Sequence, residues 1–211
     1  MKLYSENSSP YSATVRIAMY AKALNIEIVA PPGGLRSADY HKINALGTIP
    51  CLILENGTAL PESAAIMEYL EEKFPAPPLL PATAEGRAHV RMLARIGDLQ
   101  IMAQTAELLA LMHAQPRDEG AAAGRLTKIV RGLAFLQNAL SGDNFAAGAH
   151  LTLADCQLAP ALHNVPLASG AFMDRDLISA YPKVARYIET SRRHPSIDRV
   201  LAELTDAALA A

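Results

Sequence analysis

The stretch KLYSENSSPYSATVRIAMYAKALNIEIVA, residues 2–30, contains a strand, a helix and a second strand in one short run. KLYS at 2–5 predicts the first strand, and apolar side chains then recur at helical spacing from Ala13 to the helix stop Asn25. IEIVA at 26–30 is a short β-branched run, which is typical of a strand. Because strands joined by a crossover helix normally run in the same direction, we expect a parallel pair.

A hairpin follows this unit. CLILE at 51–55 indicates a buried strand, and Asn56-Gly57 is a strong two-residue hairpin signal before Ala59-Leu60. The hairpin predicts an antiparallel pair beside the parallel one. A helix from about Ser63, ended by Pro75, completes a small α/β unit.

Beyond this unit the strand pattern disappears. FPAPPLLPATAEG, residues 74–86, is rich in proline and indicates a semi-rigid, extended connection. The pattern then predicts helices at 85–113, at about 121–140, from Thr152, at roughly 182–194 and, briefly, at the end of the chain. We therefore expect an α/β domain at 1–76, a proline-rich linker at 77–86 and an all-helical domain at 87–211.

Composition excludes several classes of function. The 211 residues are 51% hydrophobic with a net charge of -2, so the basic footprint of a nucleic-acid-binding protein is missing. No apolar stretch approaches the length of a membrane span, and the early polar residues do not fit a secretory signal. Cys51 and Cys156 form neither a CxxC pair nor a metal cluster. We expect a cytoplasmic protein without a metal.

The segment ENSSPYSATVR, residues 6–16, gathers hydroxyl groups between the first strand and the first helix. Such hydroxyls are usually turn or cap residues, and Ser12 is predicted to cap the helix. A hydroxyl at a helix start can also donate to a thiolate, and that bond would lower the pKa of the thiol. None of the histidines lies in a pattern that would complete a serine-hydrolase triad.

Three further motifs were considered for binding or for stability. Glu62-Ser63 before a helix is either a serine cap with an acid that suits the helix dipole, or a site for the carboxylate and ammonium of an α-amino acid. Pro50 belongs at a strand start, and a cis Ile49-Pro50 bond would leave the Ile49 backbone free to pair with an extended ligand. Thr152 with Asp155 resembles a capping box and predicts a structural role.

Taken in order, SSPYSATVRIA, NALGTIPCLIL, LPESAAIMEYLEEKFP and LTLADC resemble the glutathione transferase family over essentially the whole chain. The resemblance implies a thioredoxin-like α/β domain with a mixed four-stranded sheet, followed by an all-α domain. It also implies a cytosolic homodimer that binds glutathione, whose γ-glutamyl end is an α-amino acid.

The resemblance assigns site residues one by one. Ser9 stands six positions before Val15, as in the serine-type classes, so it is the expected thiolate-stabilising hydroxyl, with Ser8 as the alternative and Tyr4 below both. A cis Ile49-Pro50 would pair the Ile49 backbone with the cysteinyl part of glutathione. Glu62 and Ser63 match the pair that binds the γ-glutamyl group.

The sequence departs from the family pattern at two places. Thr48 replaces the basic residue or glutamine that often precedes the X-Pro pair, so the glycine carboxylate is expected at His41 or Lys42. The VRIA pattern is most similar to the zeta class, but Tyr11 stands where that class has a cysteine, which argues against maleylacetoacetate-type isomerisation.

The expected function is therefore a glutathione transferase of the detoxification type that adds the thiolate to a small, hydrophobic electrophile. Met102, Leu109, Met112 and His113 follow one another at near-helical spacing and are candidates for the electrophile pocket, with core packing as the alternative. Two other functions remain open: glutathione-dependent isomerisation or removal of glutathione from a conjugate, and glutathione or ligand binding with little turnover. Removal of glutathione would need a reactive protein cysteine, and Cys51 is expected to be buried and inert.

Overall fold

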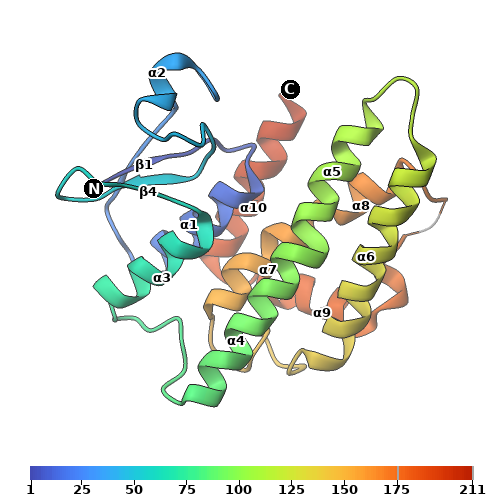
Figure 1. Cartoon of the computed structure of the whole chain (residues 1–211). Coiled ribbons are helices and arrows are strands. Elements are labelled where there is room, and N and C mark those ends of the chain that lie inside the picture. Colours follow the sequence, from blue (N-terminus) through green and yellow to red (C-terminus); the bar gives the residue numbers. More distant parts are fainter. Residues whose placement is uncertain (175, 211) are drawn as a thin grey trace. The chain divides into compact units, whose positions relative to one another are not determined.

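The computed structural model describes residues 1–174 and 176–210. The chain forms two compact units, a sheet unit and a helical unit (Figure 1). The sheet unit contains Met1–Leu79 together with the last helix, α10 (Pro195–Leu209), and the helical unit is Leu80–His194. The expected boundaries placed all residues after 86 in the helical part, whereas α10 groups with the sheet.

A mixed four-stranded sheet forms the centre of the sheet unit. Its strands β1 (Lys2–Tyr4), β2 (Glu27–Val29), β3 (Cys51–Ile53) and β4 (Ala59–Pro61) lie in the order β2-β1-β3-β4. β1 and β2 are parallel, with Leu3 beside Ile28, and β3 is antiparallel to both β1 and β4. The predicted β-α-β connection and the hairpin at Asn56-Gly57 are both confirmed.

In this unit α1 (Pro10–Ala21) packs against both α3 (Ser63–Lys73) and α10. The short α2 (Ala38–His41), which the pattern did not reveal, lies on the opposite side of the strands from α1 and α3 (Figure 1). Residues 12–19 of α1 are all buried, as expected for a helix that is covered on every side. α1 begins at Pro10, earlier than the predicted Ala13, because proline suits the first helical position and Ser9 caps it.

A buried ion pair holds the end of the sheet unit in place. Lys22 Nζ lies 2.6 Å from Glu71 Oε2 and also donates to the carbonyl oxygens of Phe74 and Pro77, at 2.7 and 2.8 Å. Both Glu71 carboxylate oxygens accept from the Leu79 N–H, at 3.1 and 3.0 Å. The pair therefore fixes the course of the proline-rich segment after α3.

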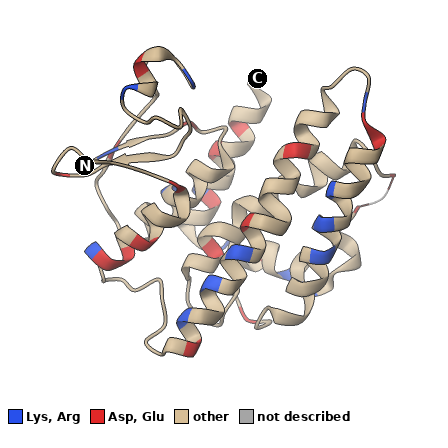
Figure 2. Cartoon of the chain, in the orientation of Figure 1, with Lys and Arg blue, Asp and Glu red and all other residues tan. Residues whose placement is uncertain are grey.

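Helices alone make up the described part of the helical unit. They are α4 (Ala84–Ile96), η1 (Gly97–Met102), α5 (Ala103–Met112), α6 (Glu119–Ala139), α7 (Leu153–His163), α8 (Val165–Gly170), η2 (Ile178–Ala180) and α9 (Pro182–Ser191). The pattern predicted one helix over 85–113, and the structure interrupts it with the π-helical turn η1. Figure 2 shows acidic and basic residues interspersed along the helices, with a basic run on α6, where Arg125 pairs with Glu107 at 2.6 Å.

Glycines allow close packing around η1. A Cβ at Gly97 would lie 2.8 Å from Leu158, and one at Gly132 would lie 2.9 Å from Ile101. Met102 is 1% exposed and its sulfur accepts from Gln157 Nε2 at 3.5 Å. Met102 is therefore a core residue of this unit, in agreement with the packing alternative.

The predicted capping box at the start of α7 is confirmed. Asp155 Oδ2 accepts from the N–H and the hydroxyl of Thr152, both at 2.8 Å, and Oδ1 accepts from Ala146 N–H at 2.8 Å. The carboxylate thus ties the preceding loop to the helix start, so Asp155 has the structural role expected of it. Among the described residues, no helix is both long and apolar enough to cross a membrane.

Candidate functional site

The strand register brings four chain segments to one edge of the sheet. Tyr4 at the end of β1 lies beside Val29 and Cys51, and Cys51 lies beside Pro61. The residues that follow β1, β2 and β4, and those that precede β3, therefore leave the sheet at the same edge. Open sheets usually bind ligands in the loops at such an edge.

A pocket of about 430 Å³ opens among these loops. Its lining residues are Glu6, Ser8, Ser9, Leu35, Arg36, Gly47, Thr48 and Ile49. Four of the predicted site residues, Ser8, Ser9, Thr48 and Ile49, are among them. The pocket thus joins the segment after β1 to the segment before β3.

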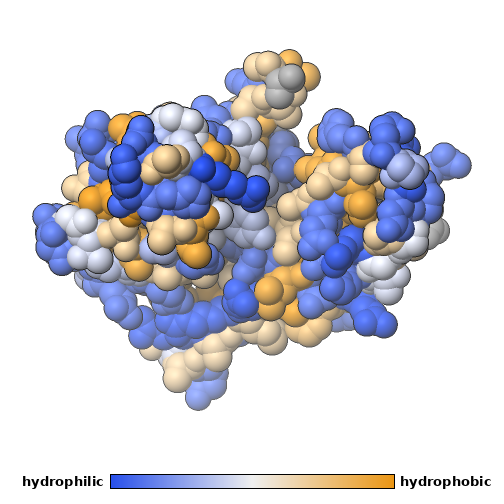
Figure 3. Space-filling view, turned by 45° about the horizontal axis from the view of Figure 1, so that its top comes forward, coloured by the Kyte–Doolittle hydropathy of each residue, from blue (hydrophilic) through white to orange (hydrophobic). Residues whose placement is uncertain are grey.

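The pocket also has an apolar side. Leu35, which lines it, and the nearby loop residue Leu46 are 46% and 54% exposed. Figure 3 shows apolar patches of this kind among polar residues on the sheet unit. Hydroxyls, the Glu6 carboxylate, a guanidinium and an exposed leucine together suit a ligand with both polar and apolar parts.

Ser9 has two roles in the structure. It is the N-cap of α1, where its Oγ accepts from the Ser12 N–H at 3.2 Å, and it lines the pocket. That bond uses a lone pair of the oxygen, so the hydroxyl hydrogen is available to donate. The prediction that Ser12 caps the helix is wrong. Ser12 lies inside α1, fully buried, and its Oγ has no hydrogen-bond partner among the described residues.

Two buried side chains hold the Thr48 carbonyl oxygen in place. Tyr40 Oη and Asn44 Nδ2 both donate to it at 2.8 Å, and Tyr40 and Asn44 are buried. Because the C=O and N–H of a trans peptide point in opposite directions, the Ile49 N–H points away from these two side chains. The Ile49-Pro50 bond is cis, as expected.

Replacing Tyr40 with phenylalanine tests this anchor. Burial raises the pKa of Tyr40 to about 12, so its hydroxyl remains a donor at neutral pH. Loss of one buried hydrogen bond costs about 1 kcal/mol, and we expect the KM for glutathione, the ligand that the sequence resemblance implies, to rise about fivefold. Tyr181→Phe, a hydroxyl removal in the helical unit, is the matched control for steady-state kinetics. An unchanged KM in Tyr40→Phe would contradict a role for the anchor in binding.

Glu62 and Ser63 directly follow β4, at the edge of the sheet where the other loops meet. Glu62, not Ser63, occupies the N-cap position of α3, and its side chain makes no capping bond, so the serine-cap interpretation is wrong. Ser63 is the first helical residue and is 8% exposed. Glu62 has φ of 72°, a conformation that non-glycine residues adopt mostly where function or context requires it. Its exposed carboxylate follows directly after β4.

Arg36 is one of four lining residues that sequence reasoning missed, and it is the basic one among them. It lines the pocket with φ of 58°, and its N–H donates to the Gly47 carbonyl at 3.2 Å. The expected basic residues have other contacts: His41 Nδ1 lies 3.1 Å from the Ala45 carbonyl oxygen, and Lys42 pairs with Asp39 at 2.7 Å. The only signal in the sequence was a basic residue shortly after the PPGG turn.

Of the two other candidates near β1 and β3, Cys51 is buried and Tyr4 is half-buried. Cys51 is fully buried, as expected, and burial raises the pKa of its thiol, which disfavours the reactive thiolate. The Tyr4 ring packs against the Tyr40 ring, with centroids 5.4 Å apart. Among the described residues, no three His, Cys, Asp or Glu side chains come together in a group that could hold a metal ion.

A sheet of this order and register, with a cis-proline loop at the edge where the pocket opens and a separate helical unit, defines a thioredoxin-like domain joined to an all-α domain. Residues 3–78 match the family model "Glutathione S-transferase, N-terminal domain", and residues 119–190 match "Glutathione S-transferase, C-terminal domain".

Relatives over the full length agree with these models. A maleylacetoacetate isomerase of Pseudomonas aeruginosa is 30% identical, covering 93% of each chain. A bacterial zeta-class maleyl pyruvate isomerase structure is 30% identical, with a TM-score of 0.78, covering 95% of this chain and 96% of that one. A glutathione S-transferase of Methylobacterium radiotolerans in complex with glutathione sulfonate is 28% identical, with a TM-score of 0.81, covering 95% of this chain and 93% of that one. The chain belongs to the glutathione S-transferase family.

Proposed function

We propose that the protein binds glutathione at the sheet edge and activates its thiol beside Ser9 for attack on an electrophile. The observation that carries this proposal is the Ser9 hydroxyl, which lines the pocket while its oxygen caps α1. The hydroxyl and the N-terminus of α1 both favour a negative charge, so a thiol placed here is ionised more readily than in water. Thiolate formation and orientation of the two reactants would supply the catalysis.

The loops offer a partner for each part of the tripeptide. The Ile49 N–H would pair with the cysteinyl backbone, because the anchored Thr48 carbonyl turns it away from Tyr40 and Asn44. The γ-glutamyl group would bind Glu62 through its ammonium, and Ser63 with the α3 N-terminus through its carboxylate. The Arg36 guanidinium is our candidate for the glycine carboxylate, in place of His41 or Lys42.

Replacing Arg36 with glutamine tests this last assignment. A hydrogen bond to a charged group is worth about 1.5–3 kcal/mol, so we expect the KM for glutathione to rise roughly tenfold or more. The kcat should change little, because the carboxylate is bound equally in the ground and transition states. Lys42→Gln is the matched control, since this lysine pairs with Asp39. A larger effect of Lys42→Gln than of Arg36→Gln would return the carboxylate to Lys42.

The reaction catalysed is part of the proposal. Two of the relatives are named as isomerases, so glutathione-dependent cis-trans isomerisation is the second candidate. Tyr11, which stands where the zeta pattern has a cysteine, argues against isomerisation, so transfer to a small hydrophobic electrophile remains the first candidate. A cytoplasmic homodimer acting in detoxification is the setting that we propose for either reaction.

The deciding experiment has two parts. Absorbance of the bound thiolate, titrated against pH, measures whether the protein lowers the thiol pKa of glutathione. A panel of aryl halides, epoxides, unsaturated carbonyl compounds and cis-configured unsaturated diacids then separates transfer from isomerisation. Glutathione binding without turnover of any of these compounds would favour a ligand-binding protein instead.

A further inference from the structure

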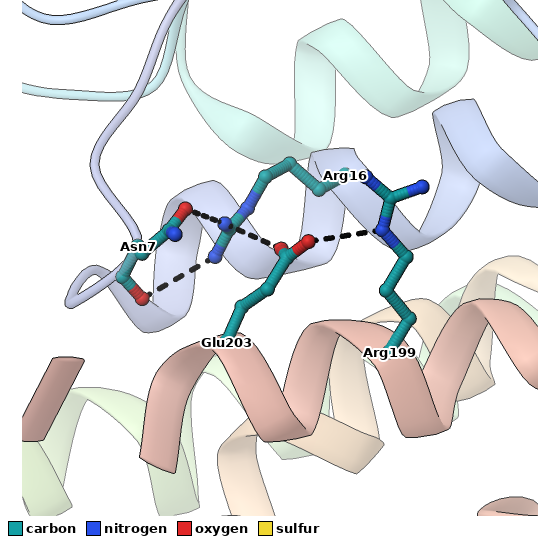
Figure 4. A network of polar contacts seen from close by, with 4 residues as sticks. All are labelled: Asn7, Arg16, Arg199 and Glu203. Carbon is teal, nitrogen blue, oxygen red and sulfur yellow. Dashed lines mark hydrogen bonds and ion pairs between the residues drawn. The ribbon is translucent and has the colours of Figure 1, made fainter. Parts of the chain in front are cut away.

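The loop that carries Ser8 and Ser9 is attached to α1 through Asn7 (Figure 4). Arg16 Nη1 donates to Asn7 Oδ1, and Arg16 Nη2 donates to the Asn7 carbonyl at 3.3 Å. The Arg16 side chain is only 1% exposed, whereas Asn7 lies at the surface. A planar guanidinium that binds both the side-chain and main-chain oxygen of one residue restricts that residue in position and in orientation.

The bond to the Asn7 carbonyl also orients the next peptide group. In a trans peptide the N–H points opposite to the C=O, so the Ser8 N–H points away from Arg16. One residue further on, the Ser9 N–H donates to the Glu6 carbonyl at 3.2 Å. The backbone that leads to the Ser9 hydroxyl is therefore fixed on both sides of Ser8.

The last helix of the chain holds the guanidinium in turn. Glu203 Oε2 accepts from Arg16 Nη1 at 2.8 Å, and Glu203 Oε1 accepts from Arg199 Nε at 3.0 Å (Figure 4). Burial lowers the pKa of Arg16, and the Glu203 carboxylate opposes that shift. A buried guanidinium needs such a partner, because an unpaired buried charge is strongly destabilising. The Arg199 guanidinium also lies over the Tyr20 ring, 4.0 Å from its centroid.

We propose that Arg16 and Glu203 are positioning residues, which act through Asn7 to hold the Ser8–Ser9 loop in the geometry that stabilises the glutathione thiolate. This proposal rests on the proposed function, because its main test measures the thiol pKa of bound glutathione. It assigns to α10 a part in the chemistry of a site to which α10 supplies no lining residue. A purely electrostatic effect of the Arg16 charge is the competing explanation.

Arg16→Lys separates these two explanations. Lysine keeps the positive charge, but its ammonium cannot hold both Asn7 oxygens and Glu203 in the planar arrangement of the guanidinium. We expect the thiol pKa of bound glutathione to rise by about one unit, a tenfold shift in the ionisation equilibrium. Without ligand, the Ser9 amide hydrogen should exchange faster than in the wild type. Glu203→Gln, which keeps an acceptor oxygen, should change both measurements in the same direction and by less.

Leu204→Ala is the matched control for stability. Leu204 is 4% exposed on α10, so its truncation weakens the packing of this helix without removing a polar contact. We expect a lower Tm with wild-type values for the thiol pKa and for Ser9 exchange. The proposal would be overturned if Arg16→Lys kept the wild-type value of either the thiol pKa or the Ser9 exchange rate, or if Leu204→Ala raised the thiol pKa as much as Arg16→Lys does.

Failure of the proposed function gives a different result. If the wild-type protein does not lower the thiol pKa of glutathione, the thiolate mechanism is rejected. The positioning role is then rejected with it. Unchanged Ser9 exchange in Arg16→Lys, beside a lowered thiol pKa in both proteins, would reject the positioning role alone.

Discussion

Replacing Ser9 with alanine is expected to raise the pKa of the bound glutathione thiol toward its value near 8.5 in water, by up to about two units. At pH 7 the ionised fraction would then fall from most of the thiol toward a limit of about 3%, so kcat/KM should fall by up to roughly 25-fold. The physical reason is the loss of the hydroxyl that lines the pocket beside the α1 N-terminus. Titration of thiolate absorbance, with kinetics at several pH values, measures both quantities.

Two further variants separate the hydroxyl from the helix cap. Alanine at an N-cap costs about 0.5–2 kcal/mol of stability, whereas glycine costs only a few tenths. Ser9→Gly should therefore raise the thiol pKa as much as Ser9→Ala while retaining more of the wild-type stability. Ser8→Ala tests the neighbouring hydroxyl: a pKa shift in Ser8→Ala that Ser9→Gly does not show would transfer the role to Ser8.

Lys22→Met should be the most destabilising of the substitutions considered. It leaves the Glu71 carboxylate, 6% exposed, without its buried cation, and removes the donor to the Phe74 and Pro77 carbonyls. Breaking a buried pair from one side costs about 3–5 kcal/mol, and we expect a loss in this range. Urea unfolding followed by two probes gives the free energy and shows whether the two units unfold together.

Lys73→Met provides the comparison for this loss. Lys73 pairs with Glu55 at 3.5 Å, and the two side chains are 44% and 65% exposed. Exposed pairs are worth about 0–1 kcal/mol, so this variant should unfold close to the wild type. A second variant, Lys22→Met with Glu71→Leu, should recover part of the stability, because it no longer buries an unpaired charge. Equal losses in Lys22→Met and Lys73→Met would show that the buried pair contributes little.

Sequence reasoning succeeded where the determinants are local. The parallel pair and the hairpin follow from period, β-branching and the Asn56-Gly57 turn, all of which act over a few residues. Ser9 could also have been recognised as the cap, because Pro10 fits the first position of a helix and so assigns the cap to the preceding residue. The prediction of Ser12 gave too little weight to that signal.

Other features depend on contacts that one-dimensional patterns do not contain. Arg36 reaches the pocket because its backbone adopts a positive φ and its N–H bonds to Gly47, neither of which its neighbours in sequence predict. The π-helical turn at Gly97–Met102 continues the apolar period of the helices around it, so the sequence pattern does not distinguish it from an α-helix. The Arg16–Glu203 pair joins residues far apart in the chain, and nothing in either local pattern selects the partner.

The grouping of α10 with the sheet has a consequence for synthesis of the chain. The sheet, α1 and α3 leave the ribosome before α10, the helix that carries the carboxylate compensating Arg16. Until Glu203 emerges, the nascent sheet unit holds a guanidinium that it cannot bury at low cost. We therefore expect the first unit made to be the last completed, so that fragments ending before Pro195 bind chaperones longer than the full chain does.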